Sequence, residues 1–257
     1  MSDTVSLERI GAVAVLTIEN EAKGNALSPP ILEALERHVD VLDRDEGVAA
    51  VVLTGRGERA FCAGADINAW GDLDACEFAR GWVLGGHRVF DRIARSAKPV
   101  IAAVNGHALG GGLELAAASD LRISVRSATF GLPEAAIGVV PGWSGTQRLA
   151  RQLPVALVKE MALLGRRLSA ERAHEVGFVN EIVECDARAR AIEVAGALSG
   201  LAPRSVEIAK YMINAGQDEG REAMIDALAS GFAASTRDRA EGVAGFRAKR
   251  KPEFRGK

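Results

Sequence analysis

The stretch PVIAAVNGHALGGGLELAAASDLRISV, residues 99–125, decides the fold class of this chain. It begins with a continuous apolar run, passes through a glycine-rich turn, continues as an apolar helix and ends in a second apolar run at residues 120–125. Short apolar runs bounded by glycine or polar turns are typical of strands that are buried on both faces. A strand, a helix and another strand in succession predict an α/β fold.

The same alternation extends toward the N-terminus. Apolar runs at residues 13–19 and 48–55 predict two further buried strands. Between them a helix is expected to begin at Ser28, because a serine N-cap is followed by Pro29 and Pro30 and then by apolar residues at helical spacing.

The C-terminal part of the chain has a different pattern. Beyond about residue 186 the sequence is wholly helical, with expected helices at 187–200, 203–216 and 222–235 separated by glycine or proline. We therefore expect an α/β core over residues 1–185 and a helical region over residues 186–257.

Composition excludes several classes of protein. Of the 257 residues 48% are hydrophobic and 26% are charged, and the formal net charge is only −2, which disfavours both disorder and a surface that coats nucleic acid. The three cysteines form no CxxC pair and the four histidines are scattered, so neither a disulfide framework nor a metal site is expected. The N-terminus lacks a signal-peptide pattern and no apolar run reaches membrane-spanning length, which favours a cytoplasmic enzyme without a membrane partner.

Two glutamates lie in apolar surroundings. Glu114 is in GGGLELAAA and Glu134 is in FGLPEAAIGVVPG. Burial of a carboxylate is costly and raises its pKa toward neutrality, where the group can give or take a proton. Two such groups brought together would form an acid/base site.

Two glycine-rich turns accompany these glutamates. FCAGADI, residues 61–67, and GHALGGGLE, residues 106–114, each follow a predicted strand. Small residues let a ligand approach the main chain, and N–H groups at a helix start lack partners within the helix. The two turns together could hold one developing oxyanion, although each alone is equally well explained as a tight structural corner.

Other motifs are weaker. GRGERA, residues 55–60, matches a loose GxGxxA but is not followed by a helical run, so a dinucleotide site is disfavoured. No glycine loop ends in Lys-Ser or Lys-Thr, and GWSGT, residues 142–146, fails the GxSxG spacing, so we interpret Ser144 as a helix cap. His107 is more readily a structural histidine, and Trp70, Trp82 and Trp143 are either core residues or the lining of an acyl pocket.

Three ordered motifs carry a family resemblance. FCAGADI, PVIAAVNGHALGGGLELAAASDLRI and ATFGLPEAAIGVVPGWSGTQRLAR together resemble the crotonase superfamily, and within it the enoyl-CoA hydratases. The resemblance covers nearly the whole chain. It implies a spiral of repeated ββα units with a helical C-terminal trimerisation region, and a homotrimer or homohexamer.

The resemblance also implies roles for individual residues. The N–H groups of Ala65 and Gly111 would form the oxyanion hole, while Glu114 and Glu134 would be the two hydratase carboxylates. Contacts to the substrate and its coenzyme A are implied for Ala63, Ala65, Asp66, Ile67, Asn68, Gly111, Pro133 and Gly142.

The implied reaction is hydration of a trans-2-enoyl-CoA to a 3-hydroxyacyl-CoA without a metal or redox cofactor. A Δ3-Δ2-enoyl-CoA isomerase, an aromatic-acyl-CoA hydratase-lyase and an RNA-binding homologue remain alternatives. Trp143 and residues 69–86 depart from the commonest family pattern where the acyl pocket is expected, so they concern the choice of acyl group. Cys62 is expected to be a small buried residue that fills space rather than a nucleophile.

The basic stretch RAKRKPEFRGK, residues 247–257, is either a solvated tail or a contact to the phosphates of coenzyme A. Lys249 and Lys251 are the first candidates for such a contact, followed by Arg56 and Lys23.

Overall fold

The structure of the chain is a computed structural model that describes residues 4–256. The chain divides after Glu207 into two compact units. The N-terminal unit contains both sheets, and the C-terminal unit is helical.

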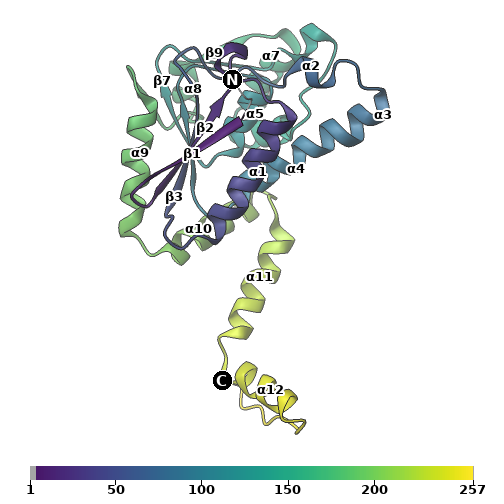
Figure 1. The fold of residues 1–257 in the computed structure, drawn as a ribbon, viewed down its shortest axis with the longest axis vertical. Helices are drawn as coiled ribbons and strands as arrows, with labels where there is room; N and C mark the ends of the chain where they lie inside the picture. The colour runs from purple at the N-terminus through teal and green to yellow at the C-terminus, as the bar shows by residue number, and fades with distance from the viewer. Residues whose placement is uncertain (1–3, 257) are drawn as a thin grey trace. The chain divides into compact units, whose positions relative to one another are not determined.

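The larger sheet forms the centre of the N-terminal unit (Figure 1). Within the described residues it has six strands, in the spatial order β1 (Thr4–Ile10), β2 (Val13–Glu19), β3 (Ala50–Gly55), β5 (Val100–Val104), β7 (Leu121–Val125) and β10 (Glu181–Val183). Only the β1–β2 pair in this sheet is antiparallel. Every residue of β3 and β5 is buried, which explains their uninterrupted apolar sequences.

A smaller sheet lies beside the larger one. Its strands in the described chain are β4 (Ala60–Cys62), β6 (His107–Leu109), β8 (Thr129–Gly131) and β9 (Arg167–Ser169), in that order. Each of β3, β5 and β7 is followed along the chain by one strand of this smaller sheet. The α/β spiral of repeated ββ units with intervening helices is therefore confirmed.

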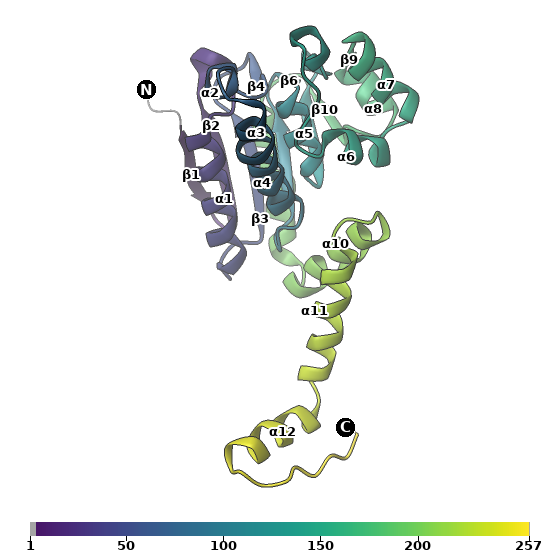
Figure 2. The same cartoon turned by 90° about the vertical axis from the view of Figure 1, so that its right-hand side faces the viewer.

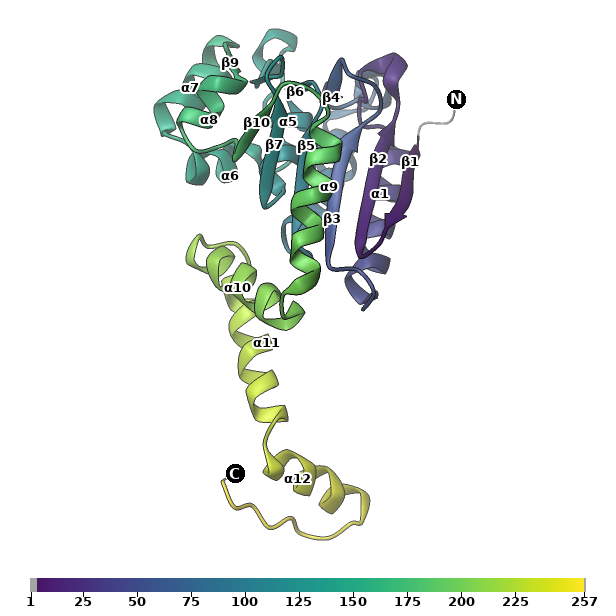
Figure 3. The ribbon, with the colours of Figure 1, turned by 90° about the vertical axis from the view of Figure 1, so that its left-hand side faces the viewer.

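Helices cover both faces of the larger sheet. Helix α9 crosses one face along β3 and β5 (Figure 3), while α1 and α4 lie on the other side (Figure 2). The helices of this unit are α1 (Pro29–Arg44), α2 (Ile67–Trp70), α3 (Ala75–Glu77), the π-helix η2 (Phe78–Val83), α4 (Leu84–Ala94), α5 (Gly111–Ala118), α6 (Gly145–Gln152), α7 (Val155–Leu164), α8 (Ala170–Glu175) and α9 (Ala187–Ala197), with short 3₁₀ turns η1 (Glu21–Lys23), η3 (Glu134–Ile137) and η4 (Leu198–Gly200).

The elements that the sequence predicted lie close to their expected positions. The strand at residues 13–19 is confirmed, and the runs at 48–55, 99–106 and 120–125 contain β3, β5 and β7. Helix α1 begins directly after Ser28, so its predicted start is confirmed, but the Ser28 side chain makes no capping hydrogen bond. Strand β1 was not predicted, since its exposed residues break the apolar run, and the three-residue strands β4, β6, β8, β9 and β10 were not predicted either.

The C-terminal helices are α10 (Pro203–Gly216), α11 (Arg221–Ala234) and α12 (Arg237–Arg247). The expected division into a core and a helical region after residue 185 stays a prediction; the boundary between the two compact units lies after Glu207, and α9 belongs to the N-terminal unit because it packs against the large sheet. Within the described chain no helix is long and apolar enough to cross a membrane.

Candidate active site

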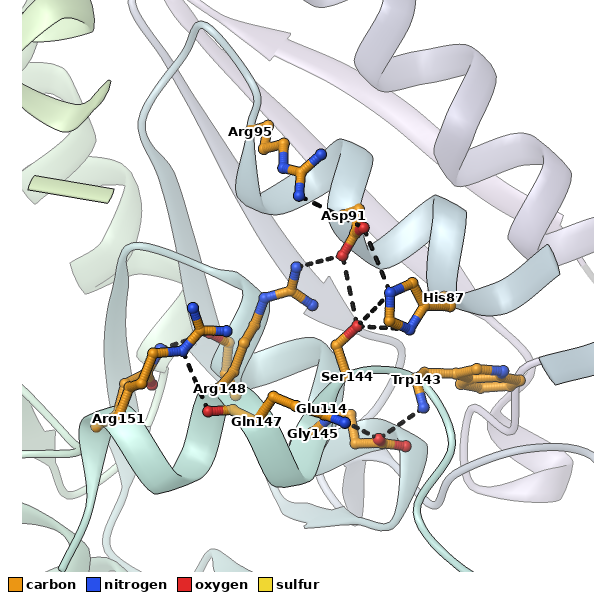
Figure 4. Close-up of polar contacts among 12 residues, drawn as sticks. His87, Asp91, Arg95, Glu114, Trp143, Ser144, Gly145, Gln147, Arg148 and Arg151 are labelled. Atoms are coloured by element: carbon orange, nitrogen blue, oxygen red, sulfur yellow. Dashed lines mark hydrogen bonds and ion pairs between the residues drawn. The ribbon is translucent and has the colours of Figure 1, made fainter. Parts of the chain in front are cut away.

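Glu114 lies in the first turn of α5 and is 2% exposed. Its Oε1 accepts hydrogen bonds from the main-chain N–H groups of Trp143 and Gly145, both at 2.8 Å (Figure 4). Burial raises the pKa of Glu114, and these N–H donors offset part of that rise. The carboxyl is therefore held in one position and has an increased affinity for a proton.

The loop that holds Glu114 approaches it closely. A Cβ on Gly145 would lie 2.2 Å from Cγ of Glu114, so only glycine fits there. Ser144, between the two donors, has a φ of 68°, in the left-handed region that most residues avoid.

The Ser144 side chain forms hydrogen bonds to two residues of α4. Its Oγ lies 2.7 Å from Nδ1 of His87 and 3.4 Å from Oδ1 of Asp91 (Figure 4). Asp91 in turn accepts a hydrogen bond from Arg148 of α6. Ser144 is the N-cap residue of α6, but its side chain makes no capping hydrogen bond, so the predicted position is confirmed and the predicted capping role is wrong.

Glu134 begins the 3₁₀ turn η3, directly after Pro133. Within residues 4–256 its buried Oε2 has no hydrogen-bond partner. Burial, and to a smaller extent the nearby charge of Glu114, together raise the pKa of Glu134 to about 7. The Oε1 of Glu134 would lie 2.8 Å from a Cβ on Gly110, which has a φ of 51°, so this glycine leaves room for the carboxyl.

Two main-chain N–H groups lie beside the carboxyls. Ala65 N would lie 3.5 Å from a Cβ on Gly111, and Gly111 N would lie 3.5 Å from a Cβ on Gly64, so the two turns are in close proximity. Neither the Ala65 nor the Gly111 N–H donates to an acceptor within the part of the chain that the structure describes. Both donors are therefore available to a ligand.

These groups line one cavity of about 270 Å³. Six of the eight residues expected to contact the substrate line it: Ala63, Ala65, Ile67, Gly111, Pro133 and Gly142. Its remaining lining residues, besides the two glutamates, are Gly64, Trp70, Phe78, Trp82, Val83, Gly110, Ala136, Ile137, Val139, Val140 and Trp143. The cavity thus combines an apolar surface with two carboxyls and two N–H donors.

Asp66 and Asn68 are not among the residues that line the cavity. Asp66 caps α2 by accepting from the Asn68 N–H at 3.1 Å and pairs with Lys23 at 2.7 Å, and this pairing lowers the pKa of Asp66. The predicted contacts of Asp66, Asn68 and Lys23 with coenzyme A stay predictions.

The other basic residues that were expected to contact the phosphates of coenzyme A lie elsewhere in the chain. Arg56 forms a two-pronged ion pair with Glu19, at 2.7 Å for each contact, and lines a different cavity. Lys249 and Lys251 belong to the C-terminal unit, so their contact with coenzyme A stays a prediction.

The surroundings of Cys62 and His107 favour a structural role for both residues. Burial raises the pKa of the Cys62 thiol to about 12, so a thiolate nucleophile is disfavoured. His107 Nδ1 lies 3.0 Å from the Thr129 hydroxyl on the neighbouring strand. Among the side chains that the structure describes, no group of three or more histidine, cysteine or acidic residues could hold a metal ion.

The contact of Ser144 with His87 and Asp91 was not expected from the sequence. His87 and Asp91 are one helical turn apart in α4, far along the chain from Ser144, and no local motif links them. In GWSGT the serine occupies a position whose backbone, with a φ of 68°, favours glycine.

Comparison with known proteins gives consistent matches over the whole chain. The family model described as enoyl-CoA hydratase/isomerase matches residues 8–257. The short-chain-enoyl-CoA hydratase of Clostridium acetobutylicum is 38% identical over 254 residues, which cover 98% of this chain and 97% of that protein. The crotonyl-CoA hydratase of Syntrophomonas wolfei is 36% identical over 255 residues, covering 98% of each chain.

A solved structure agrees with these matches. The crystal structure of an enoyl-CoA hydratase from Bacillus anthracis superposes with a TM-score of 0.81 at 35% identity, covering 98% of this chain and 99% of that one.

Proposed function

Since this chain belongs to the enoyl-CoA hydratase/isomerase family, we propose that it is an enoyl-CoA hydratase that adds water across the trans-2 double bond of an enoyl-CoA to give a 3-hydroxyacyl-CoA. The observation that carries this proposal is the pairing of Glu114 and Glu134, both with raised pKa values, in one cavity with two available N–H donors. The hydratase names of the relatives favour the same reaction.

In the proposed reaction the main chain activates the substrate. The thioester carbonyl accepts hydrogen bonds from the Ala65 and Gly111 N–H groups, which draws electron density away from the conjugated double bond. As water attacks the β-carbon, the negative charge moves onto the carbonyl oxygen. Donors that are already in place stabilise this enolate without rearranging.

The two carboxyl groups accept and donate the protons of the reaction. Glu114 orients the water and accepts its proton as the new C–O bond forms, and Glu134 donates a proton to the α-carbon as the enolate collapses. Glu114 then carries the proton taken from water, while the proton of Glu134 has passed to the α-carbon, so one proton must move from Glu114 to Glu134, directly or through water, before the next turnover. Because each charge alters the other group's proton affinity, the pair titrates as a unit.

The remaining parts of the proposal concern assembly and compartment. We propose a cytoplasmic homotrimer or homohexamer whose ligand is an acyl-CoA, without a cofactor, a membrane or a nucleic acid. Exposed large apolar side chains on α11 and α12, among them Ile225, Phe232 and Phe246, support self-association, because surfaces of this kind are usually covered by a partner.

Three substrates discriminate the proposed reaction from its alternatives. The purified protein should hydrate crotonyl-CoA, measured as the loss of absorbance of the conjugated thioester with the 3-hydroxy product identified by mass spectrometry. Isomerisation of a 3-enoyl-CoA without hydration of crotonyl-CoA would favour an isomerase. Exclusive turnover of a hydroxycinnamoyl-CoA would favour a hydratase-lyase.

A further inference from the structure

Trp82 and Trp143 close the inner end of the active-site cavity. Trp143 is 3% exposed and Trp82 is 9% exposed, whereas Ile67, Ile137 and Val140 on the same cavity are each at least half exposed. The exposed residues therefore mark the mouth of the cavity, and the two tryptophans mark its inner wall.

Packing fixes the Trp143 indole tightly in this wall. Its Nε1 donates to the main-chain oxygen of Trp82 at 3.4 Å, and its ring lies 5.2 Å from that of Trp82 and 5.1 Å from that of Phe90. A Cβ on Gly86 of α4 would lie 2.2 Å from Trp143 Nε1, and a Cβ on Gly111 of α5 would lie 2.8 Å from Trp143 Cζ3. The indole thus occupies the space between these two glycines.

A second apolar space lies on the other side of this wall. A groove of about 680 Å³ between α1 and α4 is lined by both Trp82 and Gly86, and its surface is mainly apolar. Trp82 lines the groove and the active-site cavity alike, and it belongs to the π-helix η2. π-Helical turns occur frequently at functional sites.

Chemistry sets the direction in which an enoyl-CoA would enter. The charged nucleotide of coenzyme A is too large and polar for the cavity and must remain at the mouth, while the apolar acyl chain gains most from the buried aromatic end. With the thioester at Ala65 and Gly111, the end of the acyl chain points toward Trp82 and Trp143.

The cavity is small, with a volume of about 270 Å³. It must hold the attacking water and the thioester as well as the acyl group, so a short acyl chain fits it best.

We propose that the Trp82–Trp143 wall restricts this enzyme to short enoyl chains by separating the active-site cavity from the apolar groove. This inference rests on the proposed hydratase function. Without the wall, the two spaces become continuous and longer chains enter.

The test measures kcat/KM for crotonyl-, hexenoyl-, octenoyl- and decenoyl-CoA. In the wild type we expect a fall of at least about 10-fold from crotonyl- to octenoyl-CoA, because extra methylenes meet a packed wall. Trp82→Ala and Trp143→Ala should each raise the ratio of octenoyl- to crotonyl-CoA turnover by about 10-fold or more. Trp82→Ala should have the larger effect on decenoyl-CoA, because Trp82 lines both spaces.

Phe178→Leu serves as the matched control. It shortens a fully buried aromatic residue that packs against Phe130 and lines neither space, so the chain-length ratio should stay at the wild-type value. Wild-type turnover of decenoyl-CoA equal to that of crotonyl-CoA would overturn the proposal, as would unchanged ratios in both folded tryptophan variants.

Binding separates this inference from the proposed function. If the wild type hydrates none of the four substrates, the proposed reaction fails, but calorimetric affinities for butyryl- and octanoyl-CoA still test the wall. Weaker binding of octanoyl-CoA that is reversed in Trp82→Ala supports it. Equal affinity of the wild type for both thioesters refutes it.

Discussion

The main-chain N–H of Gly145 donates to Oε1 of Glu114 at 2.8 Å, and Gly145 has no room for a side chain because a Cβ would lie 2.2 Å from Cγ of Glu114. Two motifs that are 31 positions apart in the sequence are therefore joined at one carboxyl. The same contact fixes the orientation of Glu114 and allows a variant that disturbs this orientation without removing a titratable group.

Gly145→Ala should lower kcat for crotonyl-CoA by about 10²-fold or more, because small misplacements of a catalytic group are costly. Gly196→Ala is the control, since nothing lies within 4 Å of the added Cβ in α9. It should retain full activity and gain about 0.5–1 kcal/mol in stability. Full activity in a folded Gly145→Ala protein would show that the orientation of Glu114 is unimportant.

Glu134→Gln and Glu114→Gln should each lower the hydration rate by roughly 10² or more, because an amide of nearly the same shape cannot exchange the proton. Rates are compared in folded variants whose binding of butyryl-CoA is first established by calorimetry. Near wild-type turnover by either variant would remove that residue from the acid/base pair.

The same Glu134→Gln variant should stabilise the fold in alkaline solution. The pKa of Glu134 is about 7 in the folded protein against an ordinary value of 4.5, so between these two values the unfolded chain ionises Glu134 while the folded protein keeps it protonated. The unfolded state then binds fewer protons, and wild-type stability falls as pH rises through this window. The neutral amide avoids this loss.

The measurement is Tm of both proteins by calorimetry at about pH 5 and about pH 8. The Tm advantage of Glu134→Gln should be small at the lower pH and larger at the higher one. An advantage that stays constant as pH rises would mean that Glu134 is ionised at little cost in the fold, and one that shrinks would mean that the fold favours the ionised carboxyl.

Ala65→Pro should lower kcat/KM by about 10²–10³-fold, because it deletes one main-chain donor, whereas Ala65→Ser should be tolerated. The substitution breaks no internal hydrogen bond of the Ala65 N–H, and the adjacent bonds from Leu27 N to Gly64 O and from Asp66 N to Leu27 O do not involve it. Thermal unfolding checks that the turn survives. A stably folded, fully active proline variant would exclude Ala65 as a donor.

Much of the fold was predictable because its signals are local. The buried strands have uninterrupted apolar sequences, because a parallel sheet covered on both faces leaves no room for polar side chains. Helix α5 is an apolar stretch that directly follows a glycine turn. Strand β1 was missed because it is an exposed edge strand that the antiparallel pairing with β2 holds in place.

The sequence by itself determined the chemical groups of the site: two glutamates in apolar stretches, two glycine-rich turns and the order of the motifs. Only the tertiary structure decided how these groups meet, because the distances between them depend on packing rather than on local preference. In the tertiary structure the N–H groups of Trp143 and Gly145 donate to Glu114. The Ser144 side chain contacts His87 of α4 and does not cap a helix. The Trp143 indole lies between two glycines of different helices. Such contacts join residues far apart in the chain, and no local pattern records them.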